Sequence, residues 1–218
     1  MKKPKAIIFD MDGVLLDSES LIRDVFLNSC REHGFEIPLA VFLKMVGRNQ
    51  IDSRLLVEDY AGKDFPWDSV CSQVSARTGI LTNEEGWPKK PQVEVVLESL
   101  KQLGIRLCVA TSTARKVADQ RLVSASIRDY FEEISGGDEV QFGKPNPELF
   151  LLALKRLGIT NEECLVIEDS EFGILAASEA GIRSILVPDL KQPSAQTAAL
   201  TLGVFDDLLS VLEFVKRL

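Results

Sequence analysis

The sequence predicts an α/β fold, in which a doubly wound, Rossmann-like parallel sheet carries an inserted helical domain. Short apolar runs rich in Ile and Val alternate with segments whose apolar residues recur at helical spacing. Nearly continuous apolar runs are typical of strands that are covered on both faces, as in parallel sheets. After the first run, a long stretch of purely helical pattern interrupts the alternation. Alternation with one interruption indicates a doubly wound core and one insertion.

Four apolar runs are predicted to be the buried strands of the core. Each has the short length and the content of β-branched residues that strands favour. They are Lys5–Phe9, Arg106–Ala110, Cys164–Glu168 and Arg183–Val187.

The helices of the core are predicted where apolar residues recur with a period near 3.6. These segments are Val93–Leu103, Val117–Ser124, Pro147–Leu157 and Gly173–Ala180. Gly104, Gly158 and Gly181 each follow a helical stretch. Because glycine readily adopts the left-handed conformation that ends many helices, these glycines indicate helix C-termini.

The helical stretch is expected to form a cap domain, residues 19–85, inserted into a core made of residues 1–18 and 86–218. Its pattern shows several helices in succession, broken at Phe65-Pro66-Trp67. No convincing buried strand occurs within it, and we therefore expect an all-helical insertion.

The chain is expected to cross between core and cap at Ser18–Glu19 and at Gly86–Pro91. Both crossings are predicted to act as hinges for closure over a substrate. Lys89 and Lys90, beside the second crossing, are expected to face solvent, as lysines in such positions usually do.

Composition excludes several classes of protein. The 218 residues include 25 Lys and Arg against 33 Asp and Glu, which gives a net charge of −8. An acidic balance argues against nucleic acid as a partner, because binding to phosphate backbones depends on clustered basic residues. No apolar run is long enough to span a membrane, and Asp10 and Asp12 interrupt the only stretch that could resemble an export signal. We expect a cytoplasmic protein.

Cysteine and histidine counts narrow the chemistry. The four cysteines lie far apart without a C-x-x-C pair, which is typical of free thiols in a reducing cytosol. His33 is the single histidine, so a metal cluster built on several histidines is impossible. Carboxylates are therefore expected to carry the chemistry.

Polar side chains follow three of the predicted strands. Asp10 and Asp12 follow the first, and later strands are followed by Thr111 and Ser112 and by Glu168 and Asp169. A simple turn or helix cap would explain one Asp but not the recurrence at three strand ends. Because the carboxyl ends of parallel strands line one crevice, we expect these groups to meet there.

Several carboxylates in one crevice repel each other unless a cation neutralises them. Hard oxygen ligands without His or Cys favour Mg²⁺. Lys144, held between Gly143 and Pro145, is a candidate for a second fixed positive charge, although a solvated lysine is the simpler alternative.

Together these residues resemble the four motifs of the haloacid dehalogenase superfamily. The matching segments, in chain order, are Asp10–Glu19, Ala110–Ser112, Gly143–Pro145 and Ile167–Ser170. The insertion after the first motif resembles the helical cap of the subgroup that holds β-phosphoglucomutases and sugar-phosphate phosphatases.

The resemblance implies a role for each residue. Asp10 would be the nucleophile that becomes an aspartyl phosphate, and Asp12 the general acid and base. Thr111 and the backbone N–H of Ser112 would bind the phosphoryl group, and Lys144 would balance its charge.

The resemblance also implies a Mg²⁺ site. Its ligands would be Glu168, Asp169, the side chain of Asp10 and the main-chain carbonyl of Asp12. Dehalogenases of the superfamily lack the second Asp, so the presence of Asp12 favours an oxygen leaving group.

The reaction expected from these features is Mg²⁺-dependent hydrolysis of a small phosphorylated metabolite, such as a sugar phosphate. Arg48 lies in a segment, Lys44–Arg48, that resembles a substrate-binding cap loop, and it would bind a distal phosphate or hydroxyl; a solvated arginine is the alternative. Ile22 stands where the mutases carry a histidine, which favours a phosphatase over a mutase-like phosphotransferase. A non-catalytic binding module is a third hypothesis. Oligomeric state is left open by the sequence.

Overall fold

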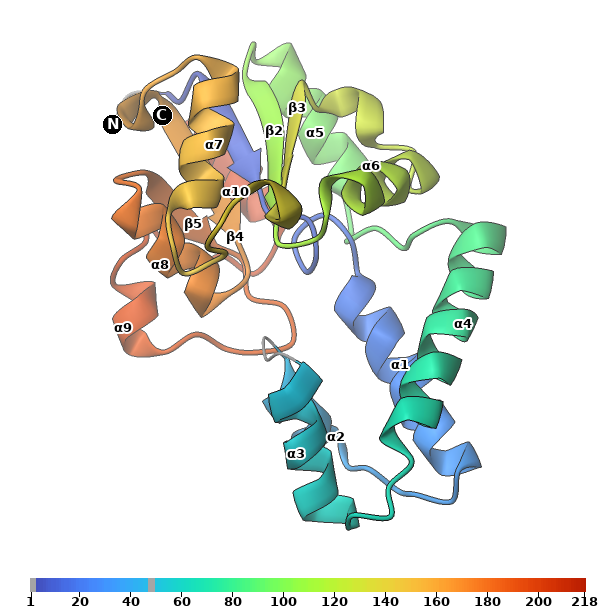
Figure 1. Cartoon of the computed structure of the whole chain (residues 1–218). Coiled ribbons are helices and arrows are strands. Elements are labelled where there is room, and N and C mark those ends of the chain that lie inside the picture. Colours follow the sequence, from blue (N-terminus) through green and yellow to red (C-terminus); the bar gives the residue numbers. More distant parts are fainter. Residues whose placement is uncertain (1–2, 47–49) are drawn as a thin grey trace. The chain divides into compact units, whose positions relative to one another are not determined.

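In the computed structural model, which describes residues 3–46 and 50–218, five parallel strands form one sheet in the order β3-β2-β1-β4-β5 (Figure 1). The strands are β1 (Ala6–Phe9), β2 (Arg106–Thr111), β3 (Glu133–Gly136), β4 (Cys164–Glu168) and β5 (Arg183–Leu186). A parallel sheet with β1 at its centre and strands added on both sides confirms the predicted doubly wound α/β fold.

One strand of the sheet, β3, has no counterpart in the sequence prediction. Its four residues include a single aliphatic side chain, Ile134, and end in a glycine. It lies at the edge of the sheet and pairs only with β2 among the described strands. Ile134, Ser135 and Gly136 are all buried, but serine and glycine are not apolar, so β3 lacks the run of aliphatic residues that identified the other strands, including β5 at the opposite edge.

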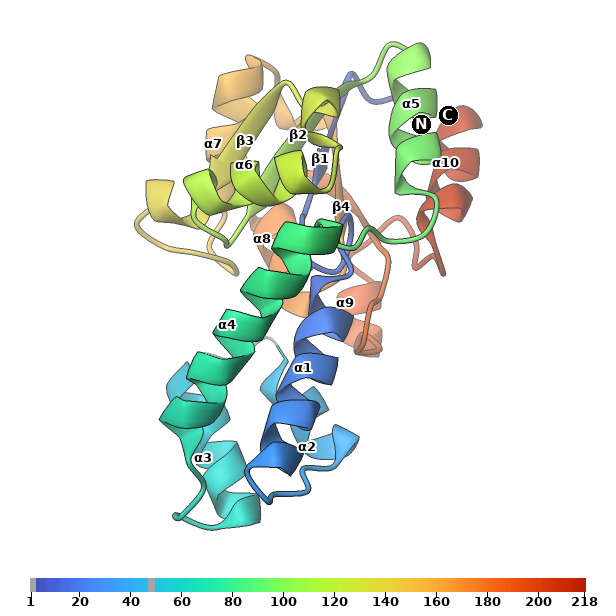
Figure 2. The ribbon, with the colours of Figure 1, turned by 90° about the vertical axis from the view of Figure 1, so that its right-hand side faces the viewer.

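Helices cover both faces of the sheet. Because crossovers between parallel strands are right-handed, α5 (Val93–Gln102) and α6 (Arg115–Ser124), on the way from β1 to β3, share one face. The chain then returns across the sheet, so α7 (Glu148–Leu157) and α8 (Glu171–Glu179) cover the other face. C-terminal α10 (Leu208–Lys216) packs against α5 (Figure 2). The sheet is thus the middle of three layers.

Shorter elements complete the core. These are α9 (Ala195–Ala198) and the 3₁₀ turns η1 (Arg128–Tyr130), η2 (Gly137–Glu139) and η3 (Asn161–Glu163). Gly104, Gly158 and Gly181 have φ of +73°, +64° and +68°, the left-handed conformation predicted for helix ends. Throughout the described part of the chain, every helix is too short or too polar to cross a membrane.

Contacts divide the chain into two units, one made of Met1–Asp17 and Lys89–Leu218 and the other of Ser18–Pro88. The predicted insertion, residues 19–85, lies within the second unit. This helical unit contains α1 (Ser18–Glu32), α2 (Leu39–Met45), α3 (Gln50–Ala61) and α4 (Trp67–Glu85). In both ribbon views α1 and α4 run side by side (Figures 1 and 2), and α2 packs against α3.

An aromatic cluster forms the centre of the helical unit. The Phe26 ring lies 5.8 Å from that of Phe42 and 6.3 Å from that of Trp67, measured between ring centroids. Phe65 contacts both Trp67 and Phe35, at 6.3 and 5.1 Å. The Phe65-Pro66-Trp67 segment therefore marks the start of α4 and also supplies two side chains, Phe65 and Trp67, to the core of this unit.

The prediction that Lys90 faces solvent is wrong. Its Nζ lies 3.1 Å from an Asp17 carboxylate oxygen and also forms an ion pair with Asp189, and its side chain is 19% exposed. Burial opposes the positive charge, but the two carboxylates raise the pKa of Lys90 above its ordinary value. Its backbone N–H donates to the carbonyl of Leu15 at 2.9 Å. The two segments where the chain leaves and re-enters the core are thus joined.

An ion pair supports the edge strand β3. Arg156 of α7 donates to both carboxylate oxygens of Glu139, at 2.7 and 2.8 Å, and to the carbonyl of Ile134 at 2.9 Å. Glu139 also accepts the backbone N–H of Gly136 at 2.9 Å. The hydrogen bonds from Arg156 are the main reason that the pKa of Glu139 falls to about 2.

Glu139→Gln is expected to lower the free energy of unfolding at neutral pH by about 1–2 kcal/mol, because it removes a charge-assisted pair. A carboxylate whose pKa is lower in the folded state stabilises above its unfolded pKa of about 4.3 and loses this effect as the pH falls towards the folded value. The difference between variant and wild type should therefore shrink between about pH 5 and pH 2 in urea titrations.

Glu213→Gln, at an exposed pair with Lys216, serves as the control and should change stability little at any pH. A Glu139→Gln difference that stays constant across this pH range would show that the charge of Glu139 does not support the strand.

Candidate active site

Two carboxylates project from the ends of neighbouring strands on the same face of the sheet. Ile8 of β1 is paired in register with Val166 of β4. Asp10 and Glu168 lie two residues further along each strand direction, and side chains two residues apart share a face. This is the face covered by α7 and α8, and both carboxylates are buried.

Lys144, in the loop that leads into α7, lies between these two carboxylates. Its Nζ is 2.5 Å from Asp10 Oδ1 and 2.5 Å from Glu168 Oε1. It also donates to the carbonyl of Ala110 at 3.3 Å and lies 5.2 Å from the centroid of the Phe150 ring. The side chain is only 6% exposed, so Lys144 is a fixed, paired charge and not a solvated lysine.

The second oxygen of Glu168 is held by the start of α8. Glu168 Oε2 accepts the backbone N–H groups of Asp169 and Ser170, at 2.9 and 2.8 Å, and the Ser170 hydroxyl at 2.9 Å. Gly173 packs against the same carboxylate so closely that a Cβ there would lie 1.7 Å from Oε1. Glu168 therefore has both oxygens bonded to the chain and no freedom to turn.

Burial sets the electrostatics of this group. It raises the pKa of Asp10 to about 8, opposed by Lys144 and reinforced by the charges of Glu168 and Asp12. Burial also opposes the charge of Lys144, but its two carboxylate partners raise the pKa of Lys144 overall. The carboxylates outnumber the lysine, and a further cation would favour the ionised form of Asp10.

The loop after β2 is held rigidly. Thr111 is buried, and its hydroxyl oxygen accepts the backbone N–H of Thr113 at 3.1 Å. The carbonyl of Thr113 accepts the N–H of Gly137 at 3.0 Å. A Cβ on Gly137 would lie 2.2 Å from the carbonyl oxygen of Ser112, so only glycine permits this approach. The two chain segments fix the backbone of Thr111 and Ser112.

Asp12 accepts hydrogen bonds from two side chains that follow β2 in the chain. Its Oδ2 accepts the hydroxyl of Thr113 at 2.9 Å, and its Oδ1 accepts Nη1 of Arg121, on α6, at 2.9 Å. The Asp12 and Arg121 side chains are 28% and 21% exposed, so the pair borders solvent.

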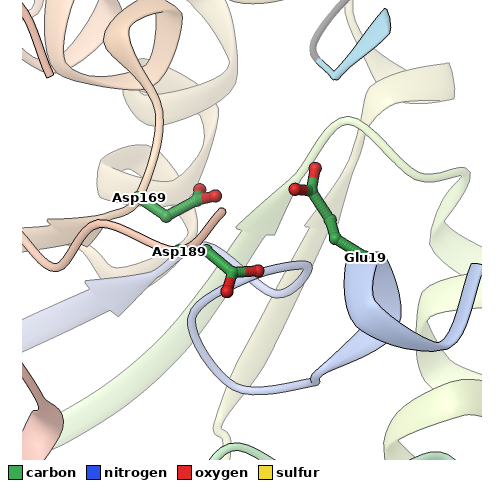
Figure 3. A group of neighbouring side chains, drawn as sticks. All are labelled: Glu19, Asp169 and Asp189. Atoms are coloured by element: carbon green, nitrogen blue, oxygen red, sulfur yellow. The ribbon is translucent and has the colours of Figure 1, made fainter. Parts of the chain in front are cut away.

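Asp169 and Asp189 follow the neighbouring strands β4 and β5, and their carboxylate oxygens lie within 4.8 Å of each other (Figure 3). Gly13, with φ of +86°, approaches Asp169 so closely that a Cβ would lie 2.4 Å from Oδ2. Figure 3 also labels Glu19, which belongs to the helical unit. At this edge the core thus presents carboxylates on two adjacent strands.

The residues predicted for the site are found, where described, at the carboxyl edge of the sheet or in contact with it. They are Asp10, Asp12, Thr111, Ser112, Lys144, Glu168 and Asp169. Arg48 lies outside the described residues.

Three residues near this edge have no counterpart in the sequence prediction. Asp189 could have been found, because it follows a predicted strand just as Asp10 and Asp169 do. Thr113 continues the polar run after β2, which is a weak indication in the sequence that it belongs to the site. The sequence gives no such indication for Arg121, because it lies in the last turn of α6 and its approach to Asp12 depends on the tertiary fold.

Comparison with known proteins points to one family. The model of the family described as haloacid dehalogenase-like hydrolase matches residues 7–187, which include every described residue of the site except Asp189. YhcW of Bacillus subtilis is 36% identical over 186 residues, 85% of this chain and 84% of that protein. The phosphorylated carbohydrates phosphatase of Thermotoga maritima is 32% identical over 216 residues, 97% of this chain and 99% of that protein.

The β-phosphoglucomutase of Clostridium difficile has the same fold. Its crystal structure matches with a TM-score of 0.73, covering 98% of this chain and 96% of that one, at 21% identity. At this identity the likeness concerns the fold alone.

Gly173→Ala is expected to displace the Glu168 carboxylate and lower the free energy of unfolding by about 1–3 kcal/mol, because the added methyl overlaps one oxygen of a carboxylate that four donors hold in place. Gly79→Ala is the matched control: it lies inside α4 with open space around its Cα and should stabilise by about 0.5–1 kcal/mol. Chemical denaturation measures both. Equal effects at the two positions would contradict the packing described around Glu168.

Proposed function

The chain belongs to the haloacid dehalogenase-like hydrolase family, and we propose that it is a Mg²⁺-dependent phosphatase that hydrolyses a small phosphorylated carbohydrate through an aspartyl-phosphate intermediate. The observation that carries this proposal is the buried Asp10–Lys144–Glu168 group at the ends of β1 and β4. Phosphoryl transfer needs a nucleophile, fixed positive charge and positioned donors, and this group combines the first two.

Asp10 is proposed to be the nucleophile. One of its oxygens would attack phosphorus and the bond from phosphorus to the ester oxygen would break, leaving the phosphoryl group on the carboxylate. Lys144 would stabilise the negative charge on the transferring oxygens. Thr111 and the backbone N–H of Ser112 would bind the same oxygens, from a loop that the Gly137 contact keeps in place.

Asp12 is proposed to move the protons of both steps. It would donate a proton to the departing alcohol, and then take one from the water that attacks the aspartyl phosphate. Phosphate would leave as the bond between phosphorus and Asp10 breaks, and the carboxylate of Asp10 would be restored.

The chemistry of the donors fits Mg²⁺. The edge offers the Asp10 and Asp169 carboxylates and the main-chain carbonyl of Asp12, which are hard oxygen ligands. When bound, the ion would neutralise charge on the phosphoryl oxygens. Glu168 was expected from the sequence to be a ligand as well. Because both of its oxygens are bonded to the chain, we propose that Glu168 positions Lys144 and would not be a direct ligand of the ion.

The name of the Thermotoga maritima relative supports phosphorylated carbohydrates as the substrate class. Ile22, where mutases of the family carry a histidine, favours release of phosphate to water over transfer back to a sugar. The net charge of −8 argues against nucleic acid as a partner. Cys30, Cys108 and Cys164, buried and unpaired as free thiols, fit a reducing cytoplasm.

Phosphate release from a panel of phosphate monoesters, with and without Mg²⁺, tests the proposal. We expect turnover of sugar phosphates that needs Mg²⁺, and a loss of about 10³-fold or more in Asp10→Asn, which removes the nucleophile. Isomerisation of β-glucose 1-phosphate without phosphate release would identify a mutase instead. Failure of the wild type on the whole panel and in that isomerisation would favour a binding module.

Isothermal titration calorimetry of Mg²⁺ binding distinguishes the role of Glu168, which ends β4, from that of Asp169, which follows it. Asp169→Asn is expected to weaken Mg²⁺ binding by about 10-fold or more, because it removes a ligand. Glu168→Gln should leave Mg²⁺ binding within about threefold while it lowers turnover, because Lys144 loses a charged partner. Equal loss of Mg²⁺ affinity in both variants would make Glu168 a direct ligand.

A further inference from the structure

We propose that Arg121 is a positioning residue that, together with Thr113, holds the Asp12 carboxylate in the orientation used for proton transfer. The inference rests on the proposed function, because it concerns the residue assigned there as general acid and base. Arg121 and Thr113 each donate a hydrogen bond to a different oxygen of Asp12, both at 2.9 Å.

Both donors come from rigid parts of the core. Arg121 lies on α6, which is anchored to the sheet by the buried side chains of Ala118 and Leu122. Thr113 is fixed on both sides, since its N–H binds the Thr111 hydroxyl and its carbonyl accepts the N–H of Gly137. A carboxylate held at both oxygens by rigid donors keeps one rotamer, which is what a group that transfers protons at a defined point requires.

The arrangement leaves Asp12 able to react. Each carboxylate oxygen has two lone-pair sites, and one donor at each leaves the other site open to a proton. Both proposed half-reactions use the same carboxylate, first to protonate an alcohol and then to deprotonate water. Misorienting it would therefore slow both steps.

Arg128 is a suitable control, because it forms an ion pair of the same kind away from the proposed catalytic residues. Arg128 forms an ion pair of 2.6 Å with Asp119, against 2.9 Å between Arg121 and Asp12, and its side chain is 29% exposed against 21% for Arg121. Neither Arg128 nor Asp119 contacts a residue proposed for catalysis among the described contacts. Arg128→Met is thus a matched control for the loss of a half-buried guanidinium.

The test uses two substrates that differ in leaving group. An alkyl phosphate such as a sugar phosphate needs a proton on its leaving oxygen, whereas p-nitrophenyl phosphate releases a stable anion without one. Arg121→Met should lower kcat for the alkyl phosphate by about 10- to 100-fold, part of the effect typical of general acid–base catalysis, with KM changed less than about threefold.

With p-nitrophenyl phosphate, the same variant should show a rapid burst of p-nitrophenolate, stoichiometric with active sites, followed by slow turnover. Formation of the phosphoenzyme does not depend on the acid, but its hydrolysis depends on the base. Arg121→Lys, which keeps one donor, should recover part of kcat, and Arg128→Met should stay within about twofold of wild type on both substrates.

Equal loss on both substrates without a burst, or unchanged kinetics, would overturn the proposal. Should Arg121→Met not fold, as judged by circular dichroism, Thr113→Val removes the donor at the other oxygen and must show the same burst; its absence would equally overturn it. If the wild type hydrolyses no ester, the proposed function fails first, which distinguishes the two outcomes.

Discussion

Burial of Lys144 between Asp10 and Glu168 is the constraint on which the rest of the site depends. An ammonium group with 6% exposure is stable only if carboxylates stay beside it, and removing one partner would leave an uncompensated buried charge. This requirement explains why Glu168 is bonded at both oxygens and why Gly173 leaves no space beside it. Asp10, the proposed nucleophile, is thereby held by interactions that also position Glu168 and Lys144.

The sheet topology brings these residues together. β1 lies at the centre, and the chain moves to one side for β2 and β3 and to the other for β4 and β5. The carboxyl ends of β1 and β4 are therefore adjacent at the point where the order of strands reverses, which is where doubly wound sheets form their binding sites. Residues distant in sequence, such as Asp10 and Lys144, meet because of this order of strands.

Most of the sheet and most residues of the candidate site could be predicted from the sequence, for physical reasons that differ between residues. Four strands, including β5 at one edge, were found because their buried side chains are aliphatic. Asp10, Thr111 and Glu168 were found because they stand at the ends of such strands. β3 was missed because two of its three buried residues are Ser135 and Gly136, which leave no apolar run. The burial of Lys90 was missed because both of its partners are remote in sequence. Arg121 could not be found, because a contact from a helix surface leaves no local pattern.

The two segments through which the chain leaves and re-enters the core are bonded to each other. Leu16 and Lys89 form a bridge, and Lys90 is bonded to Leu15, Asp17 and Asp189, so the chain leaves and re-enters the core at one fastened point. The entropy of closing a loop grows only slowly with its length. Insertions of different size can therefore be accommodated at this point without disturbing the sheet or the carboxylates at its carboxyl edge.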